Sequence, residues 1–150
     1  NLGAGKVSRI RKILFVCEVC VLVTGLLCGV GGYVFGRSLL SIYSDDPEVI
    51  VAGMIRLRFV CRLYFLCGMM DVLVGSLRGM GQSMFPMVVS LAGVCIFRLV
   101  WIATYFQVHR NIESLYVSYP LSWIITGAIH LLSFMLVYGS IQKKHKLQLA

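Results

Sequence analysis

Four long apolar runs, separated by short polar connections, dominate this sequence of 150 residues. They cover roughly residues 13–35, 52–77, 84–106 and 115–141. A helix of about 20 such residues crosses about 30 Å of hydrocarbon. Hydrophobic residues make up 59% of the chain and charged residues 13%, whereas soluble domains carry about 25% charge. The pattern predicts an all-α polytopic membrane protein with four transmembrane helices in a single membrane domain over residues 1–150.

Lysine and arginine gather at alternate ends of the predicted spans. The connections on one side hold two, Arg37 and Arg110. The other side holds eight: Lys6, Arg9, Arg11, Lys12, Arg78, Lys143, Lys144 and Lys146. By the positive-inside rule, both termini should be cytoplasmic, and we expect the plasma (inner) membrane of a bacterium. Because this distribution accounts for the net charge of +8, the bilayer is the expected partner and nucleic acid is not.

Glu18 is the one charge in the first apolar run. At 100° per residue, Gly25, Gly29, Gly32 and Gly36 lie within about 40° of it around the helix. Small residues in such a stripe let another helix approach closely. Glu18 should therefore face protein or a wet cavity, and it is a candidate for ion coupling. The alternative is a neutral glutamic acid hydrogen-bonded between helices, or one that reaches the nearby cytoplasmic surface.

The second run carries charges on two faces. Tyr64, Cys67 and Asp71 share one face, and Arg62 lies nearly opposite. Such a helix needs neighbours on both sides, or Arg62 must extend to the interface. The pattern indicates a bundle larger than four helices, with the Asp71 face as a candidate lining for a substrate or ion cavity.

The fourth run has a polar stripe at helical spacing, made by Tyr119, Ser122, Thr126, His130 and Ser133. Interhelix hydrogen bonding explains such a stripe better than contact with a ligand, and that is the interpretation we favour.

The six cysteines all lie in apolar runs, which disfavours a disulfide framework. Cys17 and Cys20 form a CxxC pair, so a four-helix membrane thiol oxidoreductase stays open as an alternative. No set of Cys and His has the spacing of a metal site, and no enzyme motif is visible. We expect neither a metal, nor a cofactor, nor enzymatic activity.

Three segments resemble the multidrug and toxic compound extrusion (MATE) family. Residues 2–6, LGAGK, resemble the end of its GQxxGAGK segment, and residues 97–102, FRLVWI, resemble its RIxW pattern. Residues 76–86 resemble its LRGxG(D/Q)xxxP connection, through Leu77, Arg78, Gly79, Gly81 and Pro86. The three follow one another in the family's order and spacing, so the resemblance covers essentially the whole chain.

The resemblance implies a transporter of twelve helices in two pseudo-symmetric lobes of six. The basic tail at 143–146 suggests a C-terminus, so we expect helices nine to twelve here, with the missing N-terminal part of the same transporter as a partner. The implied function is a secondary active multidrug antiporter that expels small organic cations in exchange for H⁺ or Na⁺. The sodium-coupled branch of the family has an acid in helix ten that aligns with Cys67, and Asp71 lies one turn further along.

Two other transporters remain open beside the thiol oxidoreductase. One is a lipid-linked polysaccharide flippase of the same superfamily. The other is an autonomous four-helix drug/proton antiporter that dimerises and uses Glu18, and the LRG segment argues against it.

The basic imbalance generates a prediction of topology. Single cysteines placed in the 79–83 connection or after Gln142 should react with a membrane-impermeant maleimide only from the cytoplasmic side. Labelling of the 79–83 connection only from outside would invert the orientation.

Overall fold

The computed structural model describes residues 1–149, with side chains described for residues 1–147. It is 86% helical, and the described residues contain no strand, which confirms the all-α class. The elements are α1 (Val7–Val34), α2 (Gly36–Leu40), α3 (Pro47–Val60), η1 (Cys61–Leu63), α4 (Tyr64–Gly79), α5 (Met84–Ser90), η2 (Leu91–Ile96), α6 (Phe97–Ala103), α7 (Tyr105–Val108) and α8 (Ile112–Leu149).

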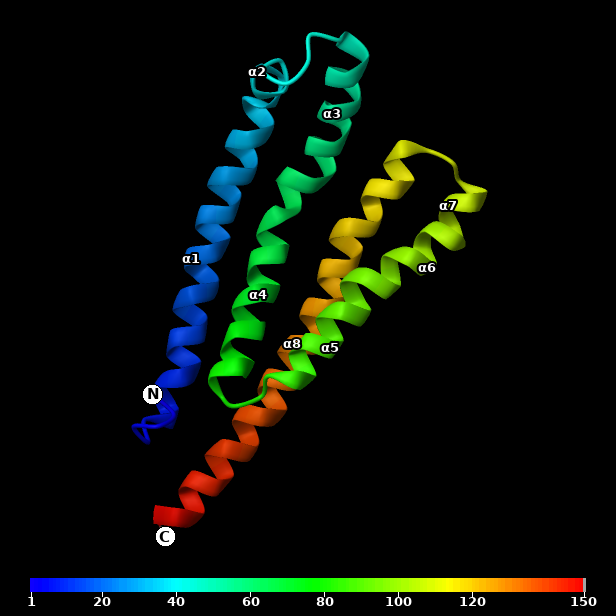
Figure 1. Cartoon of the computed structure of the whole chain (residues 1–150). Coiled ribbons are helices and arrows are strands. Elements are labelled where there is room, and N and C mark those ends of the chain that lie inside the picture. Colours follow the sequence, from blue (N-terminus) through cyan, green and yellow to red (C-terminus); the bar gives the residue numbers. More distant parts are fainter. Residues whose placement is uncertain (150) are drawn as a thin grey trace.

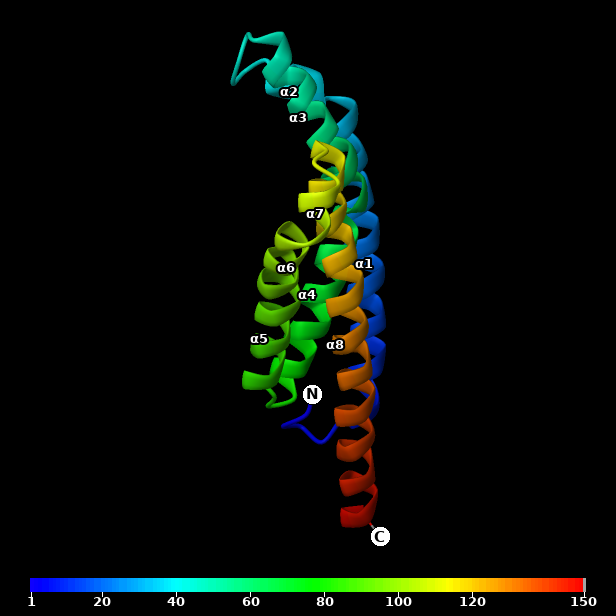
Figure 2. The same ribbon diagram turned by 90° about the vertical axis from the view of Figure 1, so that its right-hand side faces the viewer.

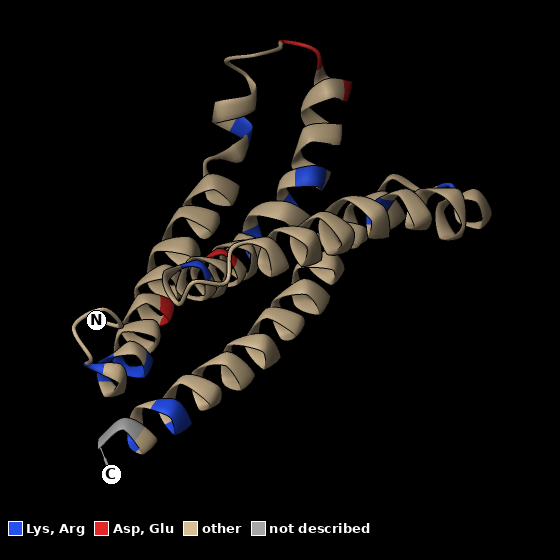
Figure 3. Cartoon of the chain, turned by 60° about the horizontal axis from the view of Figure 1, so that its bottom comes forward, with Lys and Arg blue, Asp and Glu red and all other residues tan. Residues whose placement is uncertain are grey.

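These elements form four long rods, which are α1–α2, α3–η1–α4, α5–η2–α6–α7 (the third rod) and α8. Successive rods run in opposite directions (Figure 1). The rod of α4 is central, since it packs against both α1 and α8. The α5–α6 rod lies on the opposite side of α4 from α1 (Figure 2). Both termini and the α4–α5 turn lie at one end, which we call the terminal end. Lysine and arginine gather there (Figure 3).

In the part of the chain that the structure describes, three helices are long and apolar enough to cross a membrane: Val7–Val34, Met84–Val108 and Ile112–Leu147. The second predicted span, 52–77, differs because α3 and α4 meet at a single turn of 3₁₀-helix, η1. It also carries four charged side chains: Arg56, Arg58, Arg62 and Asp71. Its crossing of the membrane therefore stays a prediction.

The start of α3 follows from local capping. The Asp46 carboxylate accepts a hydrogen bond of 2.9 Å from the backbone N–H of Glu48, and Pro47 occupies the first turn. These residue types are favoured at helix N-termini, because proline lacks the N–H that would go unpaired there.

The connection between α4 and α5 explains the spacing of the LRG segment. The N–H of Gly81 donates to the carbonyl of Arg78, and the N–H of Gln82 donates to the carbonyl of Leu77, each at 3.0 Å. This pattern is a Schellman motif, which requires a positive φ at Gly81, and the observed φ is 86°. Leu77 is fully buried below the turn. The segment thus builds a sharp helix stop anchored in the core.

The core lies toward the terminal end and is small. It consists of Leu14, Leu73, Leu77, Met80 and Phe134, contributed by α1, α4, α8 and the α4–α5 turn. Many large apolar side chains elsewhere are exposed, and Leu27 is one of them at 69%. Such a surface suits contact with lipid or with further protein.

The glycine stripe of α1 faces the α3–η1–α4 rod, as predicted for a helix contact. A Cβ at Gly25 would lie 2.9 Å from the Cα of Phe65, and a Cβ at Gly29 would collide with the carbonyl oxygen of Cys61. Glycine is thus required where the backbones of α1 and η1 meet.

We expect Gly29→Ala to destabilise the intact transporter by about 1–3 kcal/mol, the usual cost of overpacking, because its Cβ meets rigid backbone. Gly31→Ala is the matched control, since nothing lies within 4 Å of a Cβ there. Thermal unfolding in detergent measures both. Equal melting temperatures for the two variants would contradict the close contact.

Candidate functional site

The polar stripe of α8 is buried in the bundle. Ser122, Thr126 and His130 are 0% exposed, Ser118 is 1% exposed and Ser133 is 9% exposed. Their spacing of three or four residues places them on one side of α8. This side faces the third rod, because His130, Thr126 and Ser122 meet residues of α5, η2 and α6 in turn.

Near the start of the third rod, a direct hydrogen bond joins α5 to the stripe. Ser90 Oγ lies 3.0 Å from His130 Nε2. Two buried polar atoms in the stripe, His130 Nδ1 and Thr126 Oγ1, have no hydrogen-bond partner among the described residues. The stripe therefore serves interhelix contact, as we favoured from the sequence, and it keeps some unused hydrogen-bonding capacity.

The third rod changes its winding where it passes Thr126. Residues Leu91–Ile96 form a π-helix between α5 and α6. A Cβ at Gly93 would collide with Thr126 Oγ1, so glycine permits the approach of the two rods. Segments of π-helix occur frequently at functional sites. This π-helix could not be predicted from the sequence.

Arg98 has its partners on α8. Its Nε and Nη2 donate to Ser122 Oγ at 3.3 and 3.2 Å, and its guanidinium carbon lies 4.0 Å from the centre of the Tyr119 ring. The Tyr119 ring also packs edge-on against Trp123, with centroids 6.3 Å apart. Arg98 belongs to the FRLVWI segment, and the sequence did not predict these partners.

The Asp71 face of α4 opens toward the same region. Tyr64 and Asp71 are exposed and Cys67 is half-buried, so the structure brings these three candidates to one side of α4. Tyr64 packs edge-on against Trp123 of α8, with centroids 6.0 Å apart. The helix α4 also packs against α5 of the third rod. The candidate site thus lies where α4, the third rod and α8 meet.

Glu18 lies apart from Asp71. It lines a hollow of about 480 Å³ between α1 and α8, together with Arg11, Phe134 and Tyr138. Both carboxylate oxygens are buried and have no hydrogen-bond partner among residues 1–147. An unpaired carboxylate is costly in such a place, so Glu18 is suited to hold a proton or to meet a further partner.

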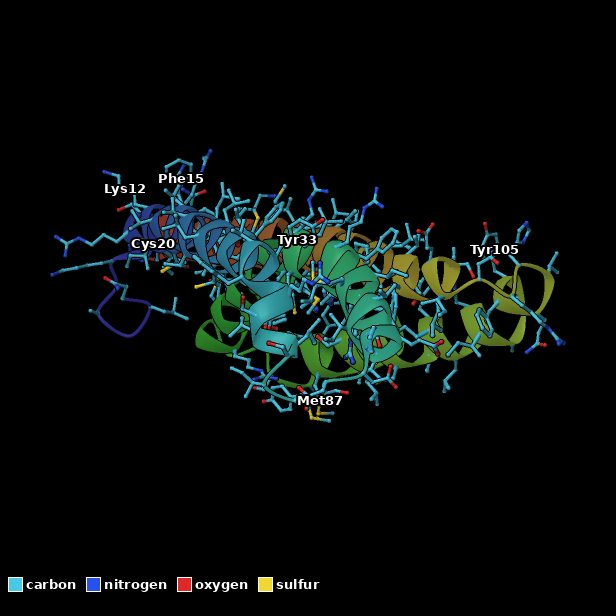
Figure 4. All side chains as sticks on the ribbon, turned by 90° about the horizontal axis from the view of Figure 1, so that it is seen from above. Lys12, Phe15, Cys20, Tyr33, Met87 and Tyr105 are labelled. Atoms are coloured by element: carbon cyan, nitrogen blue, oxygen red, sulfur yellow. The ribbon has the colours of Figure 1, made fainter. Side chains whose placement is uncertain are left out.

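Cys17 and Cys20 are exposed on α1, and all six cysteines are free thiols. Figure 4 labels Cys20 among the side chains of α1. Within the described residues, no group of three or more His, Cys, Asp or Glu side chains could hold a metal ion.

The apolar helices define a multi-pass membrane protein. The family model MatE matches residues 1–104, more than half of the chain. The chain therefore belongs to the MatE family of multidrug and toxic compound extrusion proteins, whose members are transporters rather than enzymes. The family favours neither a flippase nor a thiol oxidoreductase. No curated protein and no solved structure matches the chain.

The geometry of Arg98 generates a prediction. Arg98→Lys should lower stability by about 1–2 kcal/mol, because an ammonium keeps the charge but loses the stacking on Tyr119 and the two-nitrogen contact with Ser122. Arg110→Lys is the control, since Arg110 is exposed and its one side-chain hydrogen bond, of 3.4 Å, goes to Gln107. Chemical denaturation of the intact transporter measures the free energy of unfolding of both variants. An unchanged value for Arg98→Lys would argue against the contact.

Proposed function

We propose that this chain is helices nine to twelve of a cation-coupled efflux antiporter, which expels small organic cations in exchange for H⁺ or Na⁺. The missing N-terminal part of the transporter supplies the other helices, and both termini face the cytoplasm of a bacterium. Alternating access proceeds by rocking of one lobe against the other. The observation that carries this proposal is the exposed carboxylate of Asp71, on a MatE-family chain, in the region where three rods meet.

Asp71 can couple the two fluxes through its charge. A charged carboxylate attracts an organic cation, and binding of a proton or Na⁺ cancels that attraction. Each ligand must bind the two lobe conformations with different affinity, since a ligand with equal affinity shifts nothing. Arg78 lies on the same helix as Asp71, and His130 lies on α8, which packs against α4.

The exposed faces of Tyr64 and Asp71 favour a cavity-lining role over a structural one. A structural aspartate is normally buried and hydrogen-bonded, whereas Asp71 is exposed on α4. An aromatic ring beside a carboxylate also suits recognition of an organic cation. Glu18 is the second candidate for ion binding, because its buried oxygens have no partner in the described chain.

We expect Asp71→Asn to abolish efflux driven by an imposed ion gradient in the full-length transporter, with stability changed by less than about 0.5 kcal/mol. The amide keeps the volume but cannot take up a proton, and it attracts a cation weakly. Drug efflux from proteoliposomes and thermal unfolding give the two readouts. Glu113→Gln, an exposed acid in the first turn of α8, is the matched control.

Normal efflux with normal stability would remove Asp71 from the mechanism and turn attention to Glu18→Gln. Lost efflux with strongly lowered stability would instead indicate a structural aspartate, whose removal leaves a partner unpaired.

A further inference from the structure

A groove with a mixed apolar and cationic lining runs between α1–α2 and α3. It lies at the end of the bundle opposite the termini and has a volume of about 450 Å³. Its aliphatic lining comes from one helix and consists of Ile50, Val51, Met54 and Ile55. Its polar lining includes Tyr33, Arg37 and Arg58. Figure 4 looks onto this end of the molecule and labels Tyr33.

Two guanidinium groups, those of Arg37 and Arg58, line this groove, and a third, that of Arg62, lies beside the Tyr33 ring that also lines it. Arg37 follows Tyr33 by four residues on the α1–α2 side, and Arg62 follows Arg58 by four residues on the α3–η1 side, so each pair shares a helix face. The guanidinium carbon of Arg62 lies 5.7 Å from the centre of the Tyr33 ring. The side chains of all three arginines are exposed.

Two acids near this end of the bundle, Asp46 and Glu48, have contacts outside the groove. Asp46 uses its carboxylate to cap α3 through the N–H of Glu48. Glu48 itself lines a different hollow, next to Ile112 at the start of α8. The charged side chains that line the groove are thus arginines, and the groove attracts an anion.

The membrane setting identifies the kind of anion. Arg58 and Arg62 fall within the predicted span 52–77, where a guanidinium is costly unless it reaches the interface or meets a partner. Guanidinium forks match phosphate oxygens two at a time. A lipid headgroup carries such a phosphate at the membrane surface, and the aliphatic lining suits an acyl chain.

We propose that this groove binds an anionic phospholipid. The headgroup phosphate lies among the guanidinium groups of Arg37, Arg58 and Arg62, and one acyl chain lies along the aliphatic side of α3. The bound lipid bridges α2 to α3 and neutralises the cluster of positive charges. This site is separate from Asp71, and its test does not depend on transport.

The test is thermal unfolding of the intact transporter in detergent, with phosphatidylglycerol, phosphatidylcholine or inorganic phosphate added. We expect phosphatidylglycerol to raise the Tm by a few degrees, because a ligand that binds only the folded state stabilises it. Phosphatidylcholine and inorganic phosphate should have little effect. In the double variant Arg37→Gln/Arg58→Gln the shift with phosphatidylglycerol should be lost. Arg110→Gln, which removes a charge elsewhere, should keep it.

Several outcomes would overturn the lipid site. They are an absent shift in the unaltered protein, an equal shift with phosphatidylcholine, and a full shift in the double variant. An equal shift with inorganic phosphate would show a free-anion site instead. If the double variant does not fold, Arg37→Gln alone is measured: a reduced shift supports the site and a full shift rejects it.

Discussion

The buried polar side of α8 is the constraint on which the arrangement depends. Lipid tails are as apolar as leucine, so the hydrophobic effect does little to hold one transmembrane helix against another. The third rod is instead held at three levels, by Ser90 on His130, by Arg98 on Ser122, and by Trp101, whose Nε1–H donates to the carbonyl of Ser114 at 2.9 Å. Because a buried polar group without a partner is costly, these contacts fix the third rod against α8 both along its axis and around it.

Much of the fold could be predicted because its signals are local. Hydropathy marked the apolar rods, Asp46 and Pro47 marked the start of α3, and glycines on one side of α1 marked a helix contact. The 3₁₀ turn at Cys61–Leu63 and the π-helix at Leu91–Ile96 could not be predicted. Both depend on how neighbouring rods press together, and residues in them have no distinctive composition.

The candidate site shows the same division between local and tertiary information. Helical periodicity places Tyr64, Cys67 and Asp71 on one side of α4, since a single helix determines that relation. It also grouped Glu18 with the glycines of α1. In the structure, Glu18 and the glycines have different neighbours, because the hollow at Glu18 borders α8, whereas the glycines lie against the α3–η1–α4 rod. Which rod crosses which, and at what height, depends on contacts between segments far apart in the sequence.

The π-helix at Leu91–Ile96 makes chain length itself a determinant of the site. Each residue of a helix turns the direction of the next side chain by about 100°. Deleting one residue from this segment and restoring a regular α-helix would rotate everything that follows, and Arg98 would turn away from the ring of Tyr119 without any change in its own identity. The angular phase of α6 is therefore encoded by the number of residues before it, so a single-codon deletion here could disconnect the arginine while leaving hydropathy and helix content almost unaltered.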